Sequence, residues 1–330
     1  MYMKVRSNFF MSKSFGEIMT RKLFYLDGGA GRIIAAIPAL EKYGRNHPND
    51  DWGVIIGGWD NLVWGNTILQ DRTYNPDTKG IFDLYIKEAD IVSPEPYRVN
   101  GYFNQKLSLA EAFDELINET SDHSDLGVPK LYLSKNEEKT AANVIADAKQ
   151  QQGNKPITIV IQPFGRSARV DRGDIIDDSS RSLDPKSYLA LVKKLSTKYT
   201  SILFAENQFF LPEDNYTFKL QTDLRGWAGI IEAADYFVGC DSVGQHMARA
   251  FNKPGTVIVG STYAINTTYQ DYFQIYEKPG QKKYSPIRIC GLDSHLADRL
   301  NDTCMDFSDD QVNEIFDLIV SDIDKKVKVK

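Results

Sequence analysis

The stretch "GCDSVGQHMARAFNKPGTVIVGST", residues 239–262, contains one complete unit of an α/β fold. It overlaps the apolar run 235–241 and closes with the apolar run 255–262, and both runs are typical of buried strands. Between them, residues 242–252 space their apolar side chains along one face of a helix. A strand, a helix and a strand in close succession indicate neighbouring parallel strands, so this stretch predicts an α/β protein with a parallel sheet.

The turn that opens this helix collects residues suited to bind an anion. Asp241 ends the strand and Ser242 begins the helix, whose first backbone N–H groups have no partner within the helix and carry partial positive charge. A phosphate binds well at such an end. Gly244 permits close approach to the backbone, and His246 lies on the same helix edge as Ser242. The alternative is that Asp241 or Ser242 only caps the helix and that His246 flanks the core.

The same alternation of strands and helices runs along the rest of the 330-residue chain. It predicts further strands at residues 21–29, 52–58, 88–96, 157–165 and 201–207, and helices at residues 30–45, 109–120, 134–152, 184–199, 223–234 and 308–326. Two doubly wound, parallel-sheet domains fit this pattern and length, with a ligand cleft between their strand ends. We place the boundary in the polar segment "QQQGNKP", giving domains 1–152 and 153–330, and leave open whether helix 308–326 packs back on the first domain.

Local signals refine this outline. Pro38 inside the first helix predicts a kink or an early stop, and Ser134 with Glu137 predicts a capping box. Residues 66–82 and 94–107 carry little pattern, so we expect long loops there.

Composition limits the classes of function. The net charge of −6 disfavours a large contact with a nucleic-acid backbone. The two ends of the chain, residues 1–22 and 325–330, are basic, which fits either solvated ends or a weak contact with an anionic membrane surface or nucleic acid. No apolar run is long enough to span a membrane, and Cys240, Cys290 and Cys304 lack metal-site spacing. We therefore expect a soluble protein of the reducing cytoplasm with at most peripheral membrane contact.

Three segments resemble one enzyme family. "DLRGWAGIIEAADYFVGCDSVGQHMARAFNKPGTVIVGST" resembles the C-terminal signature of the heptosyltransferase-like glycosyltransferases of family 9, in which the helix starts with D-S/T-G-x-x-H. Here Val243 stands where glycine is usual, and Gly244 follows one place later. "IVIQPFGRSA" and "LDGGAGRIIAAIPALEKY" are similar to the family's other two motifs. The resemblance implies a GT-B fold of two Rossmann-like domains facing a central cleft. It also implies a nucleotide sugar in the second domain, an acceptor in the first, and an inverting reaction without a metal or other cofactor.

The resemblance also assigns roles to the donor-binding residues. It places the diphosphate on the start of the helix, with Asp241 orienting the turn or meeting the donor sugar. A second set contacts phosphate from the neighbouring loops, and an acidic residue at a strand end binds the ribose hydroxyls. The residues so assigned are Ser242, Val243, Gly244 and His246 for the diphosphate, Ser167 and Arg181 for further phosphate contacts, and Glu206 for the ribose.

One departure concerns the catalytic base. The family carries Gly-Asp in its first loop, and this chain has Gly31 followed by Arg32. The acceptor hydroxyl must still lose a proton, so another carboxylate is needed. Asp27 and Asp60 each end a predicted strand; we favour Asp60 because Trp59 beside it could stack on a sugar, although both residues are also common in turns. Arg32 either binds an anionic acceptor or marks a loss of transferase activity.

The sequence therefore predicts a glycosyltransferase whose donor is a nucleotide-diphosphate sugar and whose acceptor is a hydroxyl of a lipopolysaccharide-type glycan or another molecule. Two alternatives stay open: transfer to hydroxymethylated bases of phage DNA, and an inactive protein that binds a nucleotide or sugar. The acidic stretch 171–180 is expected to be a solvated loop or one that orders over the donor, and its Asp177–Asp178 pair misses the Asp-x-Asp pattern of metal-dependent enzymes. His47, His123 and His295 form no metal-ligand set.

Overall fold

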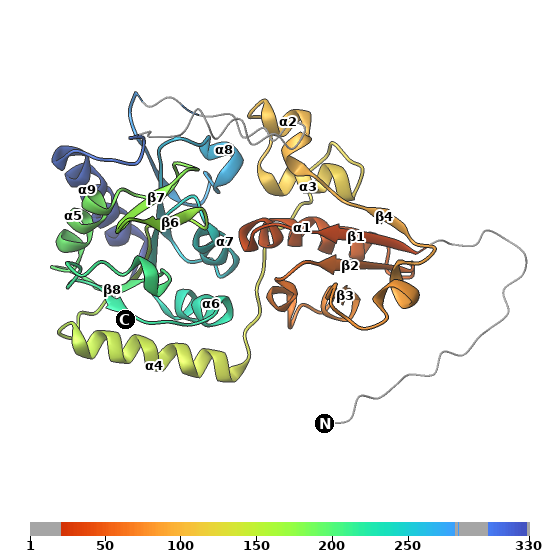
Figure 1. Cartoon of the computed structure of the whole chain (residues 1–330), viewed down its shortest axis with the longest axis horizontal. Coiled ribbons are helices and arrows are strands. Elements are labelled where there is room, and N and C mark those ends of the chain that lie inside the picture. Colours follow the sequence, from red (N-terminus) through yellow and green to blue (C-terminus); the bar gives the residue numbers. More distant parts are fainter. Residues whose placement is uncertain (1–20, 281–282, 284–302, 329–330) are drawn as a thin grey trace, which may run out of the picture.

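The computed structural model describes residues 21–280, 283 and 303–328. The basic segment before Arg21, Cys290, His295 and the last two residues of the basic tail lie outside these residues. Figure 1 shows two lobes side by side, each built around its own sheet, with helices α1 and α7 at the seam between them. The described helices include none that is long and apolar enough to cross a membrane.

The first lobe contains a four-stranded parallel sheet in the order β3-β2-β1-β4. Helix α1 connects β1 to β2 and runs through Pro38 without the early stop that the sequence allowed. The expected long loops contain several short elements. The elements of this lobe are β1 (Lys22–Leu26), α1 (Ala30–Asn46), β2 (Trp52–Ile56), η1 (Asp60–Val63), η2 (Gln70–Arg72), β3 (Thr73–Tyr74), η3 (Phe82–Ile86), β4 (Asp90–Val92), η4 (Pro96–Arg98), α2 (Asn100–Phe103) and α3 (Leu109–Ile117).

The second lobe contains a six-stranded parallel sheet in the order β12-β11-β10-β5-β8-β9, so its order reverses beside β5 and β10, as in other doubly wound sheets. A two-stranded antiparallel hairpin, β6–β7, stands where the sequence suggested only a charged loop. The elements are α4 (Lys135–Gln151), β5 (Thr158–Gln162), β6 (Ala168–Asp171), β7 (Asp174–Asp177), α5 (Pro185–Leu195), β8 (Thr200–Leu203), η5 (Asn207–Phe209), β9 (Phe218–Lys219), α6 (Leu224–Ala233), β10 (Tyr236–Cys240), α7 (Val243–Ala250), β11 (Gly255–Val259), α8 (Ala264–Thr267), β12 (Gln274–Glu277) and α9 (Asp309–Lys326).

Helices α4 and α9 both pack on the second lobe. Helix α4 begins with the predicted capping box, in which both the Ser134 and the Glu137 side chains bond to the backbone. It precedes the predicted domain boundary but packs against α6 of the second lobe, where Gly229 allows close approach to Ala141. The boundary itself stays a prediction. Helix α9 packs on α5, β11 and β12, and so covers the second sheet rather than returning to the first lobe.

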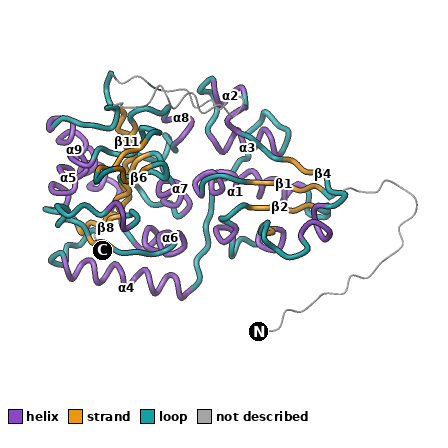
Figure 2. The backbone as a smooth tube through the Cα atoms, viewed as in Figure 1, coloured by secondary structure: helices purple, strands orange, loops and turns teal. Residues whose placement is uncertain are grey.

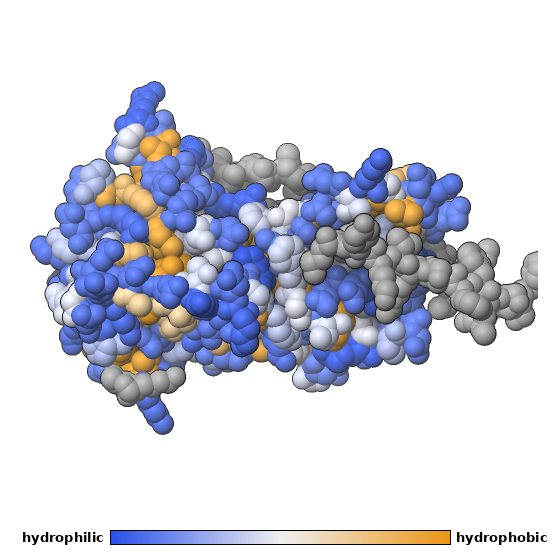
Figure 3. Space-filling model, turned by 90° about the horizontal axis from the view of Figure 1, so that it is seen from below, coloured by the Kyte–Doolittle hydropathy of each residue, from blue (hydrophilic) through white to orange (hydrophobic). Residues whose placement is uncertain are grey.

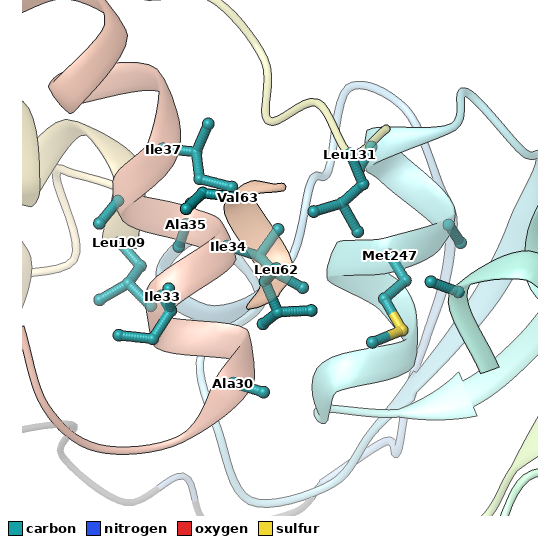
Figure 4. Packing of buried hydrophobic residues seen from close by; sticks show 14 of the residues in the cluster. Ala30, Ile33, Ile34, Ala35, Ile37, Leu62, Val63, Leu109, Leu131 and Met247 are labelled. Atoms are coloured by element: carbon teal, nitrogen blue, oxygen red, sulfur yellow. The ribbon is translucent and has the colours of Figure 1, made fainter. Parts of the chain in front are cut away.

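A continuous apolar core joins the lobes. Figure 4 shows Ile34 and Leu62 of the first lobe beside Leu131 of the connecting segment and Met247 of α7. The surface is different in character: the face in Figure 3 is mostly hydrophilic, with hydrophobic residues in small patches on both lobes. Burial of apolar side chains at the seam therefore holds the two sheets together and fixes the position of the loops that face each other across it.

Candidate functional site

The start of α7 lies at the carboxyl edge of the second sheet, directly after β10. Ser242 is the N-cap residue in an extended conformation, and its side chain makes no capping hydrogen bond. The alternative that Ser242 merely caps the helix is thus not what the structure contains. The Ser242 hydroxyl instead lies beside Gly165, whose added Cβ would be 3.9 Å from Ser242 Oγ. The helix end and the loop after β5 therefore form adjoining walls of one site.

Gly244 has a different role from the one expected. Its backbone N–H donates to Gln162 Oε1 at 2.7 Å, so this amide is already satisfied within the protein. A Cβ at residue 244 would lie 2.5 Å from Gln162 Oε1 and 2.7 Å from the Phe237 ring. Gly244 is therefore required by packing beneath α7.

His246 packs between the two lobes, and its contact with the diphosphate stays a prediction. It is buried at the seam, where its Nδ1 lies 2.8 Å from the hydroxyl of Tyr269. A Cβ on Gly31 of α1 would be 2.8 Å from His246 Cδ2, so the two sequence motifs touch here. Burial, aided by the charge of Arg181, lowers the pKa of His246 to about 4. The ring is therefore neutral at pH 7 and acts as a packing surface between the lobes.

Arg181 brings the remaining donor residues together. Its Nη2 lies 3.4 Å from Ser167 Oγ, and its Nη1 lies 3.5 Å from the Asp241 carbonyl oxygen and 4.0 Å from Asp241 Oδ2. Burial disfavours the charged guanidinium, but the carboxylates of Asp241 and Asp177 outweigh it, and the pKa of Arg181 is raised. A permanent cation thus stands next to the uncapped start of α7, with a serine hydroxyl on its other side.

The loop that carries Arg181 is held by Asp177, which the sequence analysis did not single out as functional. Asp177 Oδ1 accepts from the Ser179 N–H at 2.8 Å, and Oδ2 accepts from the Ser182 N–H at 3.0 Å. Ser182 Oγ in turn accepts from the Gly165 N–H at 2.8 Å. The signal for this loop was the spacing of Asp and Ser in "DDSSRS", which is typical of turns closed by side-chain hydrogen bonds.

Across the seam, two of the three candidate catalytic residues lie close together: Asp27 in the loop after β1, and Arg32 in the first turn of α1. The Asp27 side chain is 57% exposed and its Oδ1 lies 3.5 Å from Arg32 Nη1. The Arg32 side chain is only 9% exposed; it also contacts Glu95 Oε2 at 3.4 Å and donates to the Pro94 carbonyl at 2.9 Å. Arg32 is thus committed to its own lobe. Glu95, which the sequence analysis did not select, shares the Arg32 guanidinium with Asp27.

Asp60 and Glu206, the other two predicted residues, bond to side chains of their own lobes. Asp60 begins η1, and its Oδ1 accepts from the Asn75 side chain at 3.0 Å. Trp59 beside it donates to the Gly28 carbonyl at 3.0 Å, which ties η1 to the Asp27 loop. Glu206 is exposed after β8 and accepts from Gln208 at 3.0 Å. Among the described residues, the side-chain partners of Asp60 and Glu206 are Asn75 and Gln208, not Arg181.

Two further features bear on ligands. A cavity at the seam is lined by Ala35, the start of α3, His246 and residues 266–269, but its interior of about 10 Å³ fits no more than one water molecule. Within the part of the chain that the structure describes, no group of three or more His, Cys, Asp or Glu side chains is arranged to hold a metal ion. Arg181 and Ser167, beside the start of α7, are not among the residues that line this cavity.

The chain resembles known proteins in structure and not in sequence. No protein-family model matches the sequence, and no curated protein matches it. Among solved structures, the family 9 glycosyl transferase of Veillonella parvula matches with a TM-score of 0.64 at 10% identity, over 94% of this chain and 100% of that one. ADP-heptose lipopolysaccharide heptosyltransferase II of E. coli matches with a TM-score of 0.60 at 13% identity, over 91% of this chain and 99% of that one. The chain has the GT-B fold of the heptosyltransferases. The fold that the sequence resemblance implied is thereby confirmed.

A third solved structure adds a difference. The iron-containing, dodecameric glycosyltransferase TibC of enterotoxigenic E. coli matches with a TM-score of 0.55 at 12% identity, over 94% of this chain and 80% of that one. Iron and a dodecameric assembly are properties of that protein. At identities this low, the structural matches establish the shared fold alone. Any reaction of this chain therefore depends on its own site residues.

Proposed function

We propose that the chain is a glycosyltransferase that moves a sugar from a nucleotide-diphosphate donor to a hydroxyl acceptor. The observation that carries this proposal is the position of Arg181 beside the uncapped start of α7, at the seam of a GT-B fold. Two proteins of the same fold support it: E. coli heptosyltransferase WaaC has been solved with ADP, and TibC with ADP-D-β-D-heptose. In this chain the diphosphate would lie against Arg181, Ser167 Oγ and the amides of Ser242 and Val243.

The reaction we propose is a single displacement with inversion at the anomeric carbon. As the bond to the leaving diphosphate breaks, negative charge grows on its oxygens. Arg181 and the start of α7 place fixed positive charge there before the reaction begins, which is where electrostatic stabilisation has its largest effect. Because these groups can supply the neutralising charge themselves, we propose a metal-independent reaction. Glu206, exposed at the end of β8, remains the proposed contact for the ribose.

We propose Asp27 as the general base. Its carboxylate is exposed, it follows β1 at the edge that faces the second lobe, and Arg32 holds one of its oxygens. Asp60 was favoured by the sequence, but its carboxylate is bonded to Asn75 of its own lobe. Arg32 then serves to orient Asp27 rather than to bind an anionic acceptor, since its guanidinium already contacts two carboxylates and a carbonyl.

The acceptor is proposed to be a glycan hydroxyl. Transfer to DNA bases is not favoured, because the net charge of −6 opposes a long phosphate contact. The alternative favoured by one observation is a binding protein without turnover, since Arg32 occupies the place of the family's base. The two functions differ in turnover and agree in nucleotide binding.

A donor-hydrolysis assay separates them. A panel of nucleotide-diphosphate sugars is incubated with the protein in EDTA, with water as acceptor, and release of nucleoside diphosphate is measured. We expect turnover that Asp27→Asn lowers by about 100-fold or more, because a general base contributes on that order. Asp60→Asn and the exposed control Asp71→Asn should stay near wild type. Loss in Asp60→Asn alone would move the base to Asp60, and nucleotide binding without any turnover would establish the inactive alternative.

A further inference from the structure

Arg166 reaches from the second lobe to the first. Its Nη1 donates to the Gly28 carbonyl at 3.2 Å, and its guanidinium carbon lies 5.7 Å from the centre of the Trp59 ring. Trp59 donates to the same carbonyl at 3.0 Å. The backbone of the Gly28 loop is therefore held from both lobes at one atom.

Arg166 belongs to the loop that forms the proposed diphosphate site. Gly165 before it is bonded to Ser182 and lies against Ser242, and Ser167 after it contacts Arg181. The side chain of Arg166 alone turns the other way, toward Gly28. One short loop thus contacts the proposed leaving group through its neighbours and the opposite lobe through Arg166.

The atom that Arg166 holds is one residue from the proposed base. Gly28 has φ +94°, a backbone conformation that side-chain-bearing residues rarely adopt, so the path of the chain after Asp27 is tightly defined. Fixing the Gly28 carbonyl fixes the direction in which Asp27 leaves β1. A displacement of about 1 Å between a base and its target can cost on the order of 100-fold in rate.

We propose that Arg166 is a positioning residue: it couples closure of the seam to the placement of Asp27 opposite the diphosphate site. This inference rests on the proposed function. The partners of Arg166 are a neutral carbonyl and an aromatic ring near the surface, so the contact can break and re-form without leaving a buried charge unpaired. Arg166 therefore acts on the rate of the chemical step through Asp27 and has little part in holding the nucleotide.

The test compares Arg166→Ala with Arg166→Lys and with Arg169→Ala. Arg169 is a control on the adjoining strand β6, and its guanidinium pairs with Asp178. We expect Arg166→Ala to lower kcat by about 10- to 100-fold, with the Kd for nucleoside diphosphate changed less than about threefold. Arg166→Lys should recover part of the rate, since its ammonium can still donate to Gly28. Arg169→Ala should match wild type.

A double mutant separates positioning from a general structural effect. In an Asp27→Asn background, Arg166→Ala should cause no further loss of rate, because the two residues would act as one unit. A full additional loss, an unchanged kcat, or a weaker Kd as the main effect would each overturn the proposal. Small-angle scattering supplies a readout without turnover: Arg166→Ala should enlarge the radius of gyration, and Arg169→Ala should not. Wild-type protein that fails to bind nucleoside diphosphates refutes the proposed function, whereas normal binding with unchanged Arg166→Ala kinetics and scattering refutes only the role of Arg166.

Discussion

Two arginines of the second lobe contact the first, and they do so in opposite ways. Arg225 of α6 is 6% exposed and donates to both carboxylate oxygens of Glu137 at 2.7 and 2.8 Å, to the Tyr132 carbonyl at 2.8 Å and to the Asn61 carbonyl at 3.3 Å. Arg166, near the surface, makes one hydrogen bond to a carbonyl and lies over one ring. The guanidinium of Arg225 thus donates four hydrogen bonds through all three of its nitrogens, whereas that of Arg166 donates one.

The different numbers of partners indicate that Arg225 acts as a hinge and Arg166 as a contact that closes the seam. Arg225 binds the connecting segment, the start of α4 and η1 at once, so opening it would leave a buried charge unpaired. Arg166 lies at the edge of the seam beside the proposed site, where its contact can open at little cost. We propose that the two lobes stay joined at Arg225 and separate at Arg166, as domain closure over the proposed donor would require.

The largest expected effect comes from breaking the hinge. Arg225→Ala removes the partner of a partly buried carboxylate and should lower the free energy of unfolding by about 3 kcal/mol at pH 7, measured by chemical denaturation. The hydrogen bonds from Arg225 are the main cause that lowers the pKa of Glu137 from 4.5 to about 2. Since the folded pKa is the lower one, this stabilisation is present above about pH 4.5 and is lost as the pH falls toward 2. The gap between wild type and Arg225→Ala should therefore narrow over that range.

The control for the hinge is Glu138→Ala on the same helix. Glu138 pairs with Lys135 at 2.9 Å, but the Lys135 side chain is 95% exposed, so the change should stay within about 0.5 kcal/mol of wild type. A loss in Arg225→Ala as small as this control, or a gap that does not depend on pH, would show that Arg225 is no hinge.

A smaller effect is expected at the seam between the two contacts. Gly31→Ala places a methyl group of the first lobe 2.8 Å from His246 Cδ2 of the second. Alanine would otherwise favour a helix by about 1 kcal/mol, so the overpacking cost of about 1–3 kcal/mol should leave the protein slightly less stable and its lobes farther apart. Thermal unfolding measures the stability, and small-angle scattering measures the separation of the lobes. Gly127→Ala, where nothing lies within 4 Å, is the matched control; a Gly31→Ala protein as stable and as compact as that control would mean that the lobes do not depend on this contact.

Much of the fold could be predicted because it depends on local pattern. The alternation of strands and helices, the capping box at Ser134 and the turn before α7 all follow from residues close together in the sequence. Strands β9 and β12 were missed because such short edge strands carry too little pattern. The β6–β7 hairpin did leave a signal in the sequence, namely Gly173. Its turn is formed by Arg172 and Gly173, both with positive φ, a conformation that glycine adopts readily.

The site was harder to predict where distant residues meet. The family resemblance predicted one shared site for Ser167, Arg181, Asp241 and Ser242, and these residues lie together in the structure. It could not reveal that Gln162 occupies the Gly244 amide, or that Gly31 from the other lobe packs on His246, because both contacts depend on tertiary packing. The Asp27–Arg32–Glu95 cluster was missed for the same reason.

Calorimetric titration with nucleoside diphosphates and the matching monophosphates tests the central claim most directly. At pH 7 with EDTA, at least one diphosphate among ADP, UDP and GDP should bind about 10-fold or more tightly than its monophosphate, and Arg181→Ala should abolish that difference while the fold stays intact by circular dichroism. Equal binding of diphosphate and monophosphate, or a preference that survives in Arg181→Ala, would contradict the claim that Arg181 and the start of α7 bind the leaving group.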